Sequence, residues 1–156
     1  MVNLSQLCFN LTILLAFSPL IQKDQKKVFQ FYKTVQIHRN RITRVKRDLL
    51  NLRTQLKRKE RECIRLARDR ENFIPSLKAF QSYLKVYEKG VKALFDKKRI
   101  IYKDFLKTVE KVDRPRAKSI AENLKIKLSR IKEEQRTTLR FAVTRQRSLT
   151  RKVIKR

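Results

Sequence analysis

A seven-residue repeat of apolar side chains runs through residues 24–73 and predicts one long helix that packs against a partner. The repeat has two series of positions, and ten of its thirteen positions are clearly apolar. The first series is Val28, Val35, Ile42, Leu49, Leu56 and Cys63, and the second is Phe31, His38, Val45, Leu52, Lys59, Leu66 and Phe73. A heptad kept over this length is typical of a coiled coil. We interpret His38 and Lys59 as polar positions that fix its register.

Three prolines, Pro19, Pro75 and Pro115, divide the chain, because proline interrupts a helix beyond its first turn. The predicted helices cover about residues 24–73, 76–112 and 116–155. Ser76 directly follows a proline and is the predicted N-cap of the second helix. With one glycine and three prolines in 156 residues, the chain lacks the turn residues of a β-rich fold.

The second predicted helix has an apolar face that is wider than a strict heptad seam. Its seam residues are Leu77, Leu84, Val91, Lys98, Phe105 and Val112, together with Phe80, Tyr87, Leu94, Ile101 and Thr108. Tyr83, Phe95, Tyr102, Leu106 and Val109 widen the face, which favours contact with two partners. We therefore predict an all-α fold with an antiparallel coiled-coil hairpin of the first two helices and a third, basic helix docked along it.

The hairpin predicts specific neighbours and a division of the chain into three parts. A turn at Pro75 would place Leu66 near Leu84 and Leu52 near Lys98. The predicted parts are an uncharged apolar segment (1–22), the helical hairpin (23–113) and a basic C-terminal helix or tail (114–156). The apolar stripe of the last part is interrupted by glutamines, so we expect its second half to be only partly buried.

The chain carries 42 Lys and Arg residues against 14 Asp and Glu residues, a net charge of +28. This charge is far above the magnitude of roughly 2–8 that suits a small soluble domain, and it indicates a polyanionic partner. Residues 24–73 hold 16 basic and 6 acidic side chains, and residues 114–156 hold 15 and 3. Both stretches contain more Arg than Lys, and Arg matches phosphate oxygens bidentately. We therefore expect the first and third helices to contact the polyanion.

Two rows of basic residues are the candidate contacts. Arg39, Lys46 and Arg53 recur every seven residues beside the first seam. A second row on the third helix lies within about 60° and away from its apolar stripe, and its members are Arg136, Arg140, Arg147 and Arg151. The predicted RNA- or polyanion-binding residues are Arg39, Lys46, Arg53, Arg136, Arg140, Arg145, Arg147, Arg151, Lys152, Lys155 and Arg156. The alternative is that these charges only keep helix faces soluble, but a threefold excess of base over acid is not explained by that alternative.

Residues 1–22 contain no Asp, Glu, His, Lys or Arg, and residues 11–17 are nearly all apolar. They lack the basic region of a secretory signal and the arginines of a mitochondrial presequence. Polar residues interrupt the roughly 20 apolar residues that a membrane span needs. Burial in an assembly, membrane contact and a targeting role all stay open for this segment.

The sequence shows no catalytic constellation, so we predict that the protein is not an enzyme and has no cofactor or metal. His38 is the only histidine and lies on the seam. Cys8 and Cys63 form no metal-ligand or redox motif, and the single glycine, Gly90, cannot build a phosphate-binding loop. Glu133 and Glu134 are adjacent and do not share a helix face.

These observations predict a structural RNA-binding component of a large ribonucleoprotein, a ribosomal and possibly organellar protein that neutralises rRNA phosphates with Arg-rich helices. Its expected partners are RNA and neighbouring proteins of that assembly. A coiled-coil scaffold on an acidic protein lattice such as a microtubule is the alternative, and a peripheral membrane protein anchored by residues 1–22 is the third. The expected location is intracellular and ribosome-associated, in the cytoplasm or the mitochondrion.

Overall fold

The computed structural model describes the backbone of residues 18–154 and the side chains of residues 23–154. It contains α2 (Ser18–Leu66), the short 3-10 helix η1 (Arg70–Asn72), α3 (Phe73–Glu110) and α4 (Pro115–Ile154), and no strand occurs in this part of the chain. The predicted all-α fold with three long helices is confirmed. Predictions for residues 1–17, 155 and 156 lie outside the described residues.

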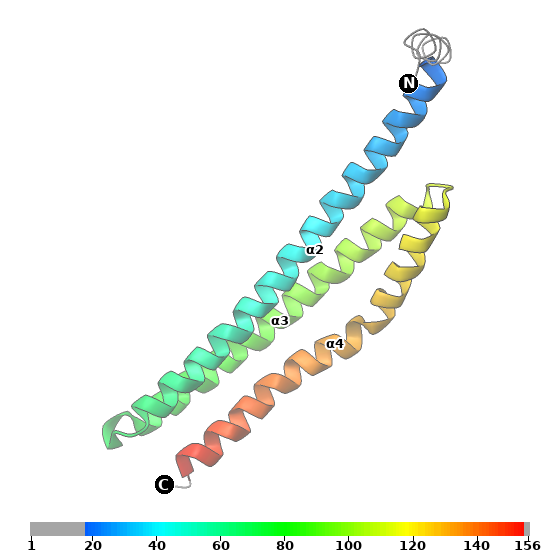
Figure 1. Ribbon diagram of the computed structural model, residues 1–156. Helices are drawn as coiled ribbons and strands as arrows, with labels where there is room; N and C mark the ends of the chain where they lie inside the picture. Colours follow the sequence, from blue (N-terminus) through cyan, green and yellow to red (C-terminus); the bar gives the residue numbers. More distant parts are fainter. Residues whose placement is uncertain (1–17, 155–156) are drawn as a thin grey trace, which may run out of the picture. The chain divides into compact units, whose positions relative to one another are not determined.

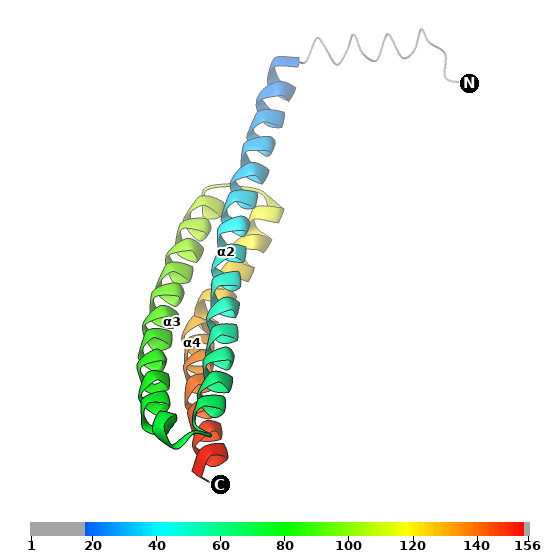
Figure 2. The same cartoon turned by 90° about the vertical axis from the view of Figure 1, so that its left-hand side faces the viewer.

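The chain divides into two units, residues 1–37 and 38–156. Residues 18–37 of the first unit form the start of α2, in which the Phe31 and Tyr32 rings meet edge to face with centroids 5.7 Å apart. In the second unit, α2 from His38 onward, α3 and α4 lie side by side, and α3 runs antiparallel to the other two (Figures 1 and 2).

Contacts between all three helices hold the second unit together. Between α2 and α3, the Tyr83 hydroxyl donates to Gln55 Oε1 at 3.0 Å. Between α3 and α4, the Tyr87 hydroxyl donates to the Thr138 carbonyl at 3.0 Å. Burial of Tyr87 raises the pKa of its phenol, so this hydroxyl stays a donor at neutral pH. The helix α3 thus contacts two partners, as its wide apolar face predicts.

Of the twelve predicted seam residues within α2, seven are buried, four are half-buried and one is exposed. Lys59 is exposed and forms an ion pair with Glu62 (3.6 Å), whereas the next residue, Glu60, is buried. The buried residues in this part of α2 are therefore Leu56, Glu60 and Cys63, at spacings of four and three. The prediction of Lys59 as a register-fixing core residue was wrong, because at this level the inward position of α2 shifts by one residue.

The prolines lie inside the helices rather than before them. Pro19 is the second residue of α2, Pro75 the third of α3 and Pro115 the first of α4. Proline is tolerated in a first turn, where the backbone N–H has no helical acceptor. Ser76 is consequently not an N-cap: its buried hydroxyl donates to the Phe73 carbonyl at 2.9 Å.

The turn between α2 and α3 covers residues 67–72, earlier than predicted, and this changes the register of the hairpin. Leu52 lies against Gly90, where an added Cβ would be 2.9 Å from Leu52 Cδ1. Lys98, the predicted neighbour of Leu52, is eight residues further along α3, about 12 Å at 1.5 Å per residue. The predicted register was therefore wrong by about two helical turns.

The second half of α4 is partly buried, as predicted. Ala142 and Leu149 are each only 2% exposed, while Gln146 on the same helix is exposed to solvent. The core of the second unit therefore extends along most of α4.

Candidate functional site

Two adjacent cavities lie between α2 and α4. The larger, of about 490 Å³, is lined by Lys46, Leu49, Leu50, Arg53, Tyr87, Thr137, Thr138, Arg140, Phe141 and Thr144. The smaller, of about 280 Å³, is lined by Arg39, Ile42, Thr43, Lys46, Tyr102, Phe105, Ile120, Asn123, Leu124 and Lys127. Lys46 lines both, so the two cavities are neighbours along α2, and we call the pair of them the basic groove.

The charged residues of the basic groove are all basic. They are Arg39, Lys46 and Arg53 of α2 and Lys127 and Arg140 of α4, and no Asp or Glu lines either cavity. All five are exposed, and within residues 23–154 none of them forms an ion pair. No acid in the lining offsets their positive charge, which favours an anion in the groove.

The heptad spacing of α2 explains why three of these bases share one side. Arg39, Lys46 and Arg53 each follow one seam residue by the same number of positions, so the helix turns all three to the same flank. The row predicted from the sequence is therefore present on α2, and Arg140 and Lys127 face it from α4.

Phe141 of α4 lies beside the larger cavity and is surrounded by cations. The Arg53 guanidinium carbon is 4.4 Å from the centroid of its ring, the Arg145 guanidinium carbon 5.1 Å and Lys57 Nζ 5.8 Å. These distances are within the range of cation–π attraction. The ring therefore holds two guanidinium groups from different helices in place.

Arg145, one of the predicted binding residues, forms an ion pair inside the bundle. Its Nη1 lies 3.6 Å from Oε2 of Glu60, whose side chain is 5% exposed. Glu60 Oε1 and Arg145 Nε have no hydrogen-bond partner among the described residues. This pair links α4 to α2, so Arg145 has a structural contact that the other predicted residues of α4 lack.

The remaining predicted residues of α4 lie on its exposed surface outside the groove. Arg136, Arg147, Arg151 and Lys152 are exposed, and Arg136 forms an exposed ion pair with Glu133 (3.7 Å). Of the second predicted row, the structure thus brings only Arg140 into the basic groove.

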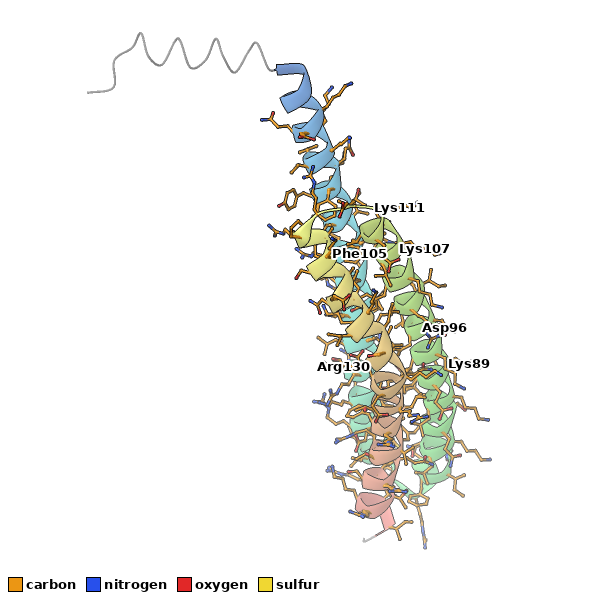
Figure 3. The ribbon with its side chains drawn as sticks, turned by 90° about the vertical axis from the view of Figure 1, so that its right-hand side faces the viewer. Lys89, Asp96, Phe105, Lys107, Lys111 and Arg130 are labelled. Atoms are coloured by element: carbon orange, nitrogen blue, oxygen red, sulfur yellow. The ribbon has the colours of Figure 1, made fainter. Side chains whose placement is uncertain are left out.

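The outer side of α3 is also basic but carries acids as well. Lys89, Asp96 and Lys107 lie along this side, away from α4 (Figure 3). Asp96 accepts a hydrogen bond from Arg99 Nη1 at 3.0 Å. This side of α3 is therefore a solvated helix surface of mixed charge, unlike the basic groove, whose charged lining residues are all basic.

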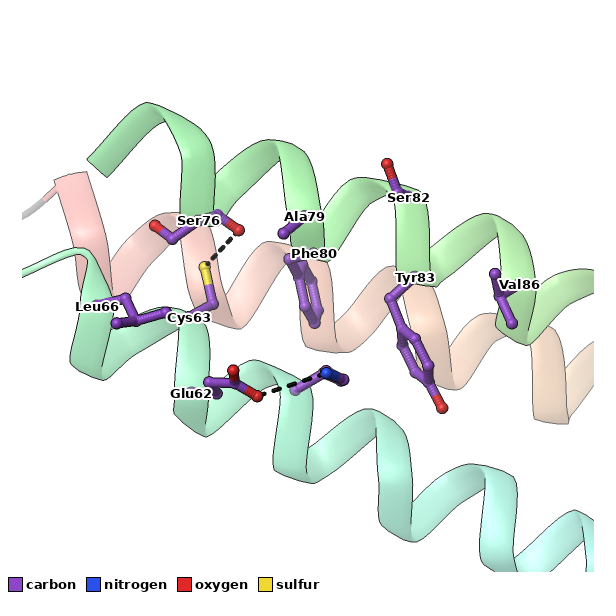
Figure 4. A pocket seen from close by; sticks show the side chains of 10 residues that line it. Glu62, Cys63, Leu66, Ser76, Ala79, Phe80, Ser82, Tyr83 and Val86 are labelled. Atoms are coloured by element: carbon purple, nitrogen blue, oxygen red, sulfur yellow. Dashed lines mark hydrogen bonds and ion pairs between the residues drawn. The ribbon is translucent and has the colours of Figure 1, made fainter. Parts of the chain in front are cut away.

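A third cavity, of about 400 Å³, lies near the turn between α2 and α3 and is mainly apolar (Figure 4). The Cys63 thiol on its wall donates to the Ser76 carbonyl at 3.4 Å. Burial raises the pKa of this thiol, and the side chain of Ser76, as distinct from its carbonyl, acts in the opposite direction. A thiol with a raised pKa is a poor nucleophile at neutral pH.

Within residues 18–154, no helix is both long and apolar enough to cross a membrane. In the same part of the chain, no group of three or more His, Cys, Asp or Glu residues is placed to hold a metal ion. No protein-family model, curated protein or solved structure matches this chain.

Sequence reasoning missed Lys127 and Phe141 as parts of the basic groove. Lys127 lies in the first half of the third helix, where the bases are interspersed with acids, so its position facing α2 had no local signal. Phe141 stands between basic residues in an acid-free stretch, which was a readable hint. Its contact with Arg53, 88 residues earlier in the chain, depends on the packing of α4 against α2.

Proposed function

We propose that this protein is a structural RNA-binding component of a large ribonucleoprotein, such as a ribosome, and that the basic groove is its main RNA contact. One observation carries the proposal: the groove gathers five unpaired cations from two helices and no acid. The groove would neutralise RNA phosphates and release their condensed counterions.

The spacing of the basic residues favours binding to the phosphate backbone of RNA over recognition of its base edges. Arg39, Lys46 and Arg53 are spaced by about 10.5 Å along α2, at 1.5 Å per residue, so they can follow a strand rather than enclose one group. The groove contains no Asn or Gln cluster that would read base edges, with Asn123 as the single side-chain amide in its lining. Recognition by shape and phosphate is typical of structural RNA-binding proteins.

The proposal is tested by comparing two triple variants that lose the same charge. The groove variant carries Lys46→Gln, Arg53→Gln and Arg140→Gln. The control variant carries Lys89→Gln, Lys97→Gln and Lys107→Gln, which are exposed positions of α3 outside the groove. The affinity of each for a labelled RNA hairpin with a single-stranded tail is measured over a series of salt concentrations.

We expect the groove variant to lower the slope of log affinity against log salt by about 2 to 3, since each lost phosphate contact removes roughly 0.7–0.9. The control variant should change the slope by less than about 1. If both variants change the salt slope equally, RNA binding depends only on net charge. That result would contradict the proposal that the groove is the main RNA contact. Binding to acidic filaments that excess RNA does not displace would favour the protein-lattice alternative instead.

A further inference from the structure

The side chain of Arg53 differs from the other bases of the groove because an aromatic ring supports it. Its guanidinium carbon lies 4.4 Å from the centroid of the Phe141 ring, close enough for contact with the ring face. Arg53 is nevertheless exposed and lines the larger cavity. One side of the guanidinium thus meets the phenyl ring while the residue remains accessible from the cavity.

The larger cavity has the size and the polar groups of a small-ligand site. Its volume of about 490 Å³ lies within the roughly 300–1,000 Å³ of ligand pockets. Lys46 and Arg140 supply positive charge from its two opposing helices. The hydroxyls of Thr137 and Thr144 donate to the Glu133 and Arg140 carbonyls, so both retain acceptor lone pairs for a ligand.

From these features we infer that the larger cavity takes one unpaired nucleotide of single-stranded RNA, with its base stacked on the Arg53 guanidinium. The inference rests on the proposed RNA-binding function and specifies its substrate as single-stranded. Lys46 and Arg140 contact the flanking phosphates. Unstacked bases of single strands stack on guanidinium planes in this way, whereas the bases of a duplex are already paired and stacked.

The test uses two substitutions that keep the charge. Arg53→Lys preserves the positive charge but removes the planar group that can stack. Arg58→Lys is the matched control, because Arg58 is an exposed arginine of the same helix that lines neither cavity of the basic groove. The probes are a single-stranded RNA that contains 2-aminopurine and a duplex RNA of the same length.

We expect Arg53→Lys to weaken single-strand binding by about five- to tenfold, the lower end of what one lost stacking interaction costs, while the salt slope stays unchanged. Arg58→Lys should weaken it by less than about twofold, and neither should affect duplex binding. The fluorescence of 2-aminopurine should change on binding to the unmodified protein, and Arg53→Lys should reduce that change. A second variant, Thr144→Leu, adds bulk without an aromatic ring to the cavity lining from an exposed position and should reduce the change as well.

The outcomes separate this inference from the proposed function. If Arg53→Lys binds single strands as tightly as Arg58→Lys, or if the duplex binds more tightly than the single strand, the stacking site is wrong although RNA binding stands. If the unmodified protein binds neither RNA in a salt-dependent way, the proposed function itself fails. Circular dichroism melts of each variant confirm that the helices are intact.

Discussion

Leu52 of α2 packs against Gly90 of α3 so closely that a Cβ on the glycine would lie 2.9 Å from Leu52 Cδ1. This contact sets the register of the two antiparallel helices at the level of the larger cavity. Gly90 has an ordinary helical backbone without a positive φ. Its lack of a side chain is therefore used for close approach of the helices and not for a turn.

The first prediction concerns the size of the residue at position 90. Gly90→Ala should stabilise the protein by less than about 1 kcal/mol, because helix propensity improves and the tip of the half-buried Leu52 can turn aside. Gly90→Leu should destabilise it by about 1–3 kcal/mol through overpacking. Urea denaturation of both variants measures the free energies of unfolding, and equal stability of the two would contradict the contact.

The second prediction concerns Lys98, whose side chain is 8% exposed and whose Nζ lies 2.9 Å from Glu134 Oε2. Glu134→Gln leaves this ammonium buried without its carboxylate and should cost about 1–3 kcal/mol, less than for a fully buried pair because Glu134 is half exposed. Lys98→Met should be within about 1 kcal/mol of the unmodified protein.

Asp96→Asn is the control for this pair, since Asp96 holds Arg99 at an exposed site and its loss should cost less than about 0.5 kcal/mol. Thermal denaturation in parallel buffers compares the variants. A loss from Glu134→Gln as small as that from Asp96→Asn would mean that the pair does not hold α4 on α3.

The third prediction compares how much Glu60 and Glu62 each contribute to the free energy of unfolding. Glu60→Ala should destabilise the protein by about 2 kcal/mol, because it removes a buried carboxylate from Arg145 and loosens α4 from α2. Glu62→Ala breaks only the exposed pair with Lys59 and should cost less than about 0.5 kcal/mol. Chemical denaturation curves measure the free energy of unfolding of both variants. A larger loss from Glu62→Ala than from Glu60→Ala would refute the inward position of Glu60.

The fourth prediction is a pH dependence that arises from His38. Its ring stacks on Phe105 with centroids 4.9 Å apart, and burial, followed by the charge of Arg41, lowers its pKa below 6.5, while Asp104 acts in the opposite direction. Because the unfolded chain binds the proton more readily, stability is fully present above pH 6.5 and falls as the pH drops from there toward the lowered folded-state pKa.

His38→Phe keeps a ring against Phe105 and removes the titration. As His38 is the only histidine, the difference in unfolding free energy between the unmodified protein and this variant isolates its contribution between about pH 5 and 7. We expect the unmodified protein to lose stability relative to His38→Phe as the pH falls. A difference that is constant with pH would contradict a lowered pKa.

The sequence predicts the helices and one row of the groove well because both depend on local periodicity. The seven-residue spacing alone places Arg39, Lys46 and Arg53 on one side of α2, whichever helix packs against it. The facing residues Lys127 and Arg140 become partners only when α4 packs on α2, and nothing local specifies which face docks.

The error in the hairpin register has its physical origin in the turn between α2 and α3. Pro75 reads as a break, but a proline in a first turn costs little, so α3 begins before it at Phe73. The displaced turn changes every neighbour across the hairpin, including the replacement of Lys98 by Gly90 beside Leu52. The exchange of Lys59 for Glu60 is a separate error: the inward position of α2 shifts by one residue there, and Arg145 on α4 supplies the compensating charge.

The most direct test of the account is lysine footprinting of the unmodified protein with and without bound RNA. Acetylation rates are read by mass spectrometry at Lys46 and Lys127 in the basic groove and at Lys89 and Lys107 on the outer side of α3. All four are exposed in the protein alone. The account predicts that RNA slows acetylation of Lys46 and Lys127 severalfold and leaves Lys89 and Lys107 nearly unchanged. Uniform protection of all four, or protection of the α3 lysines alone, would contradict it.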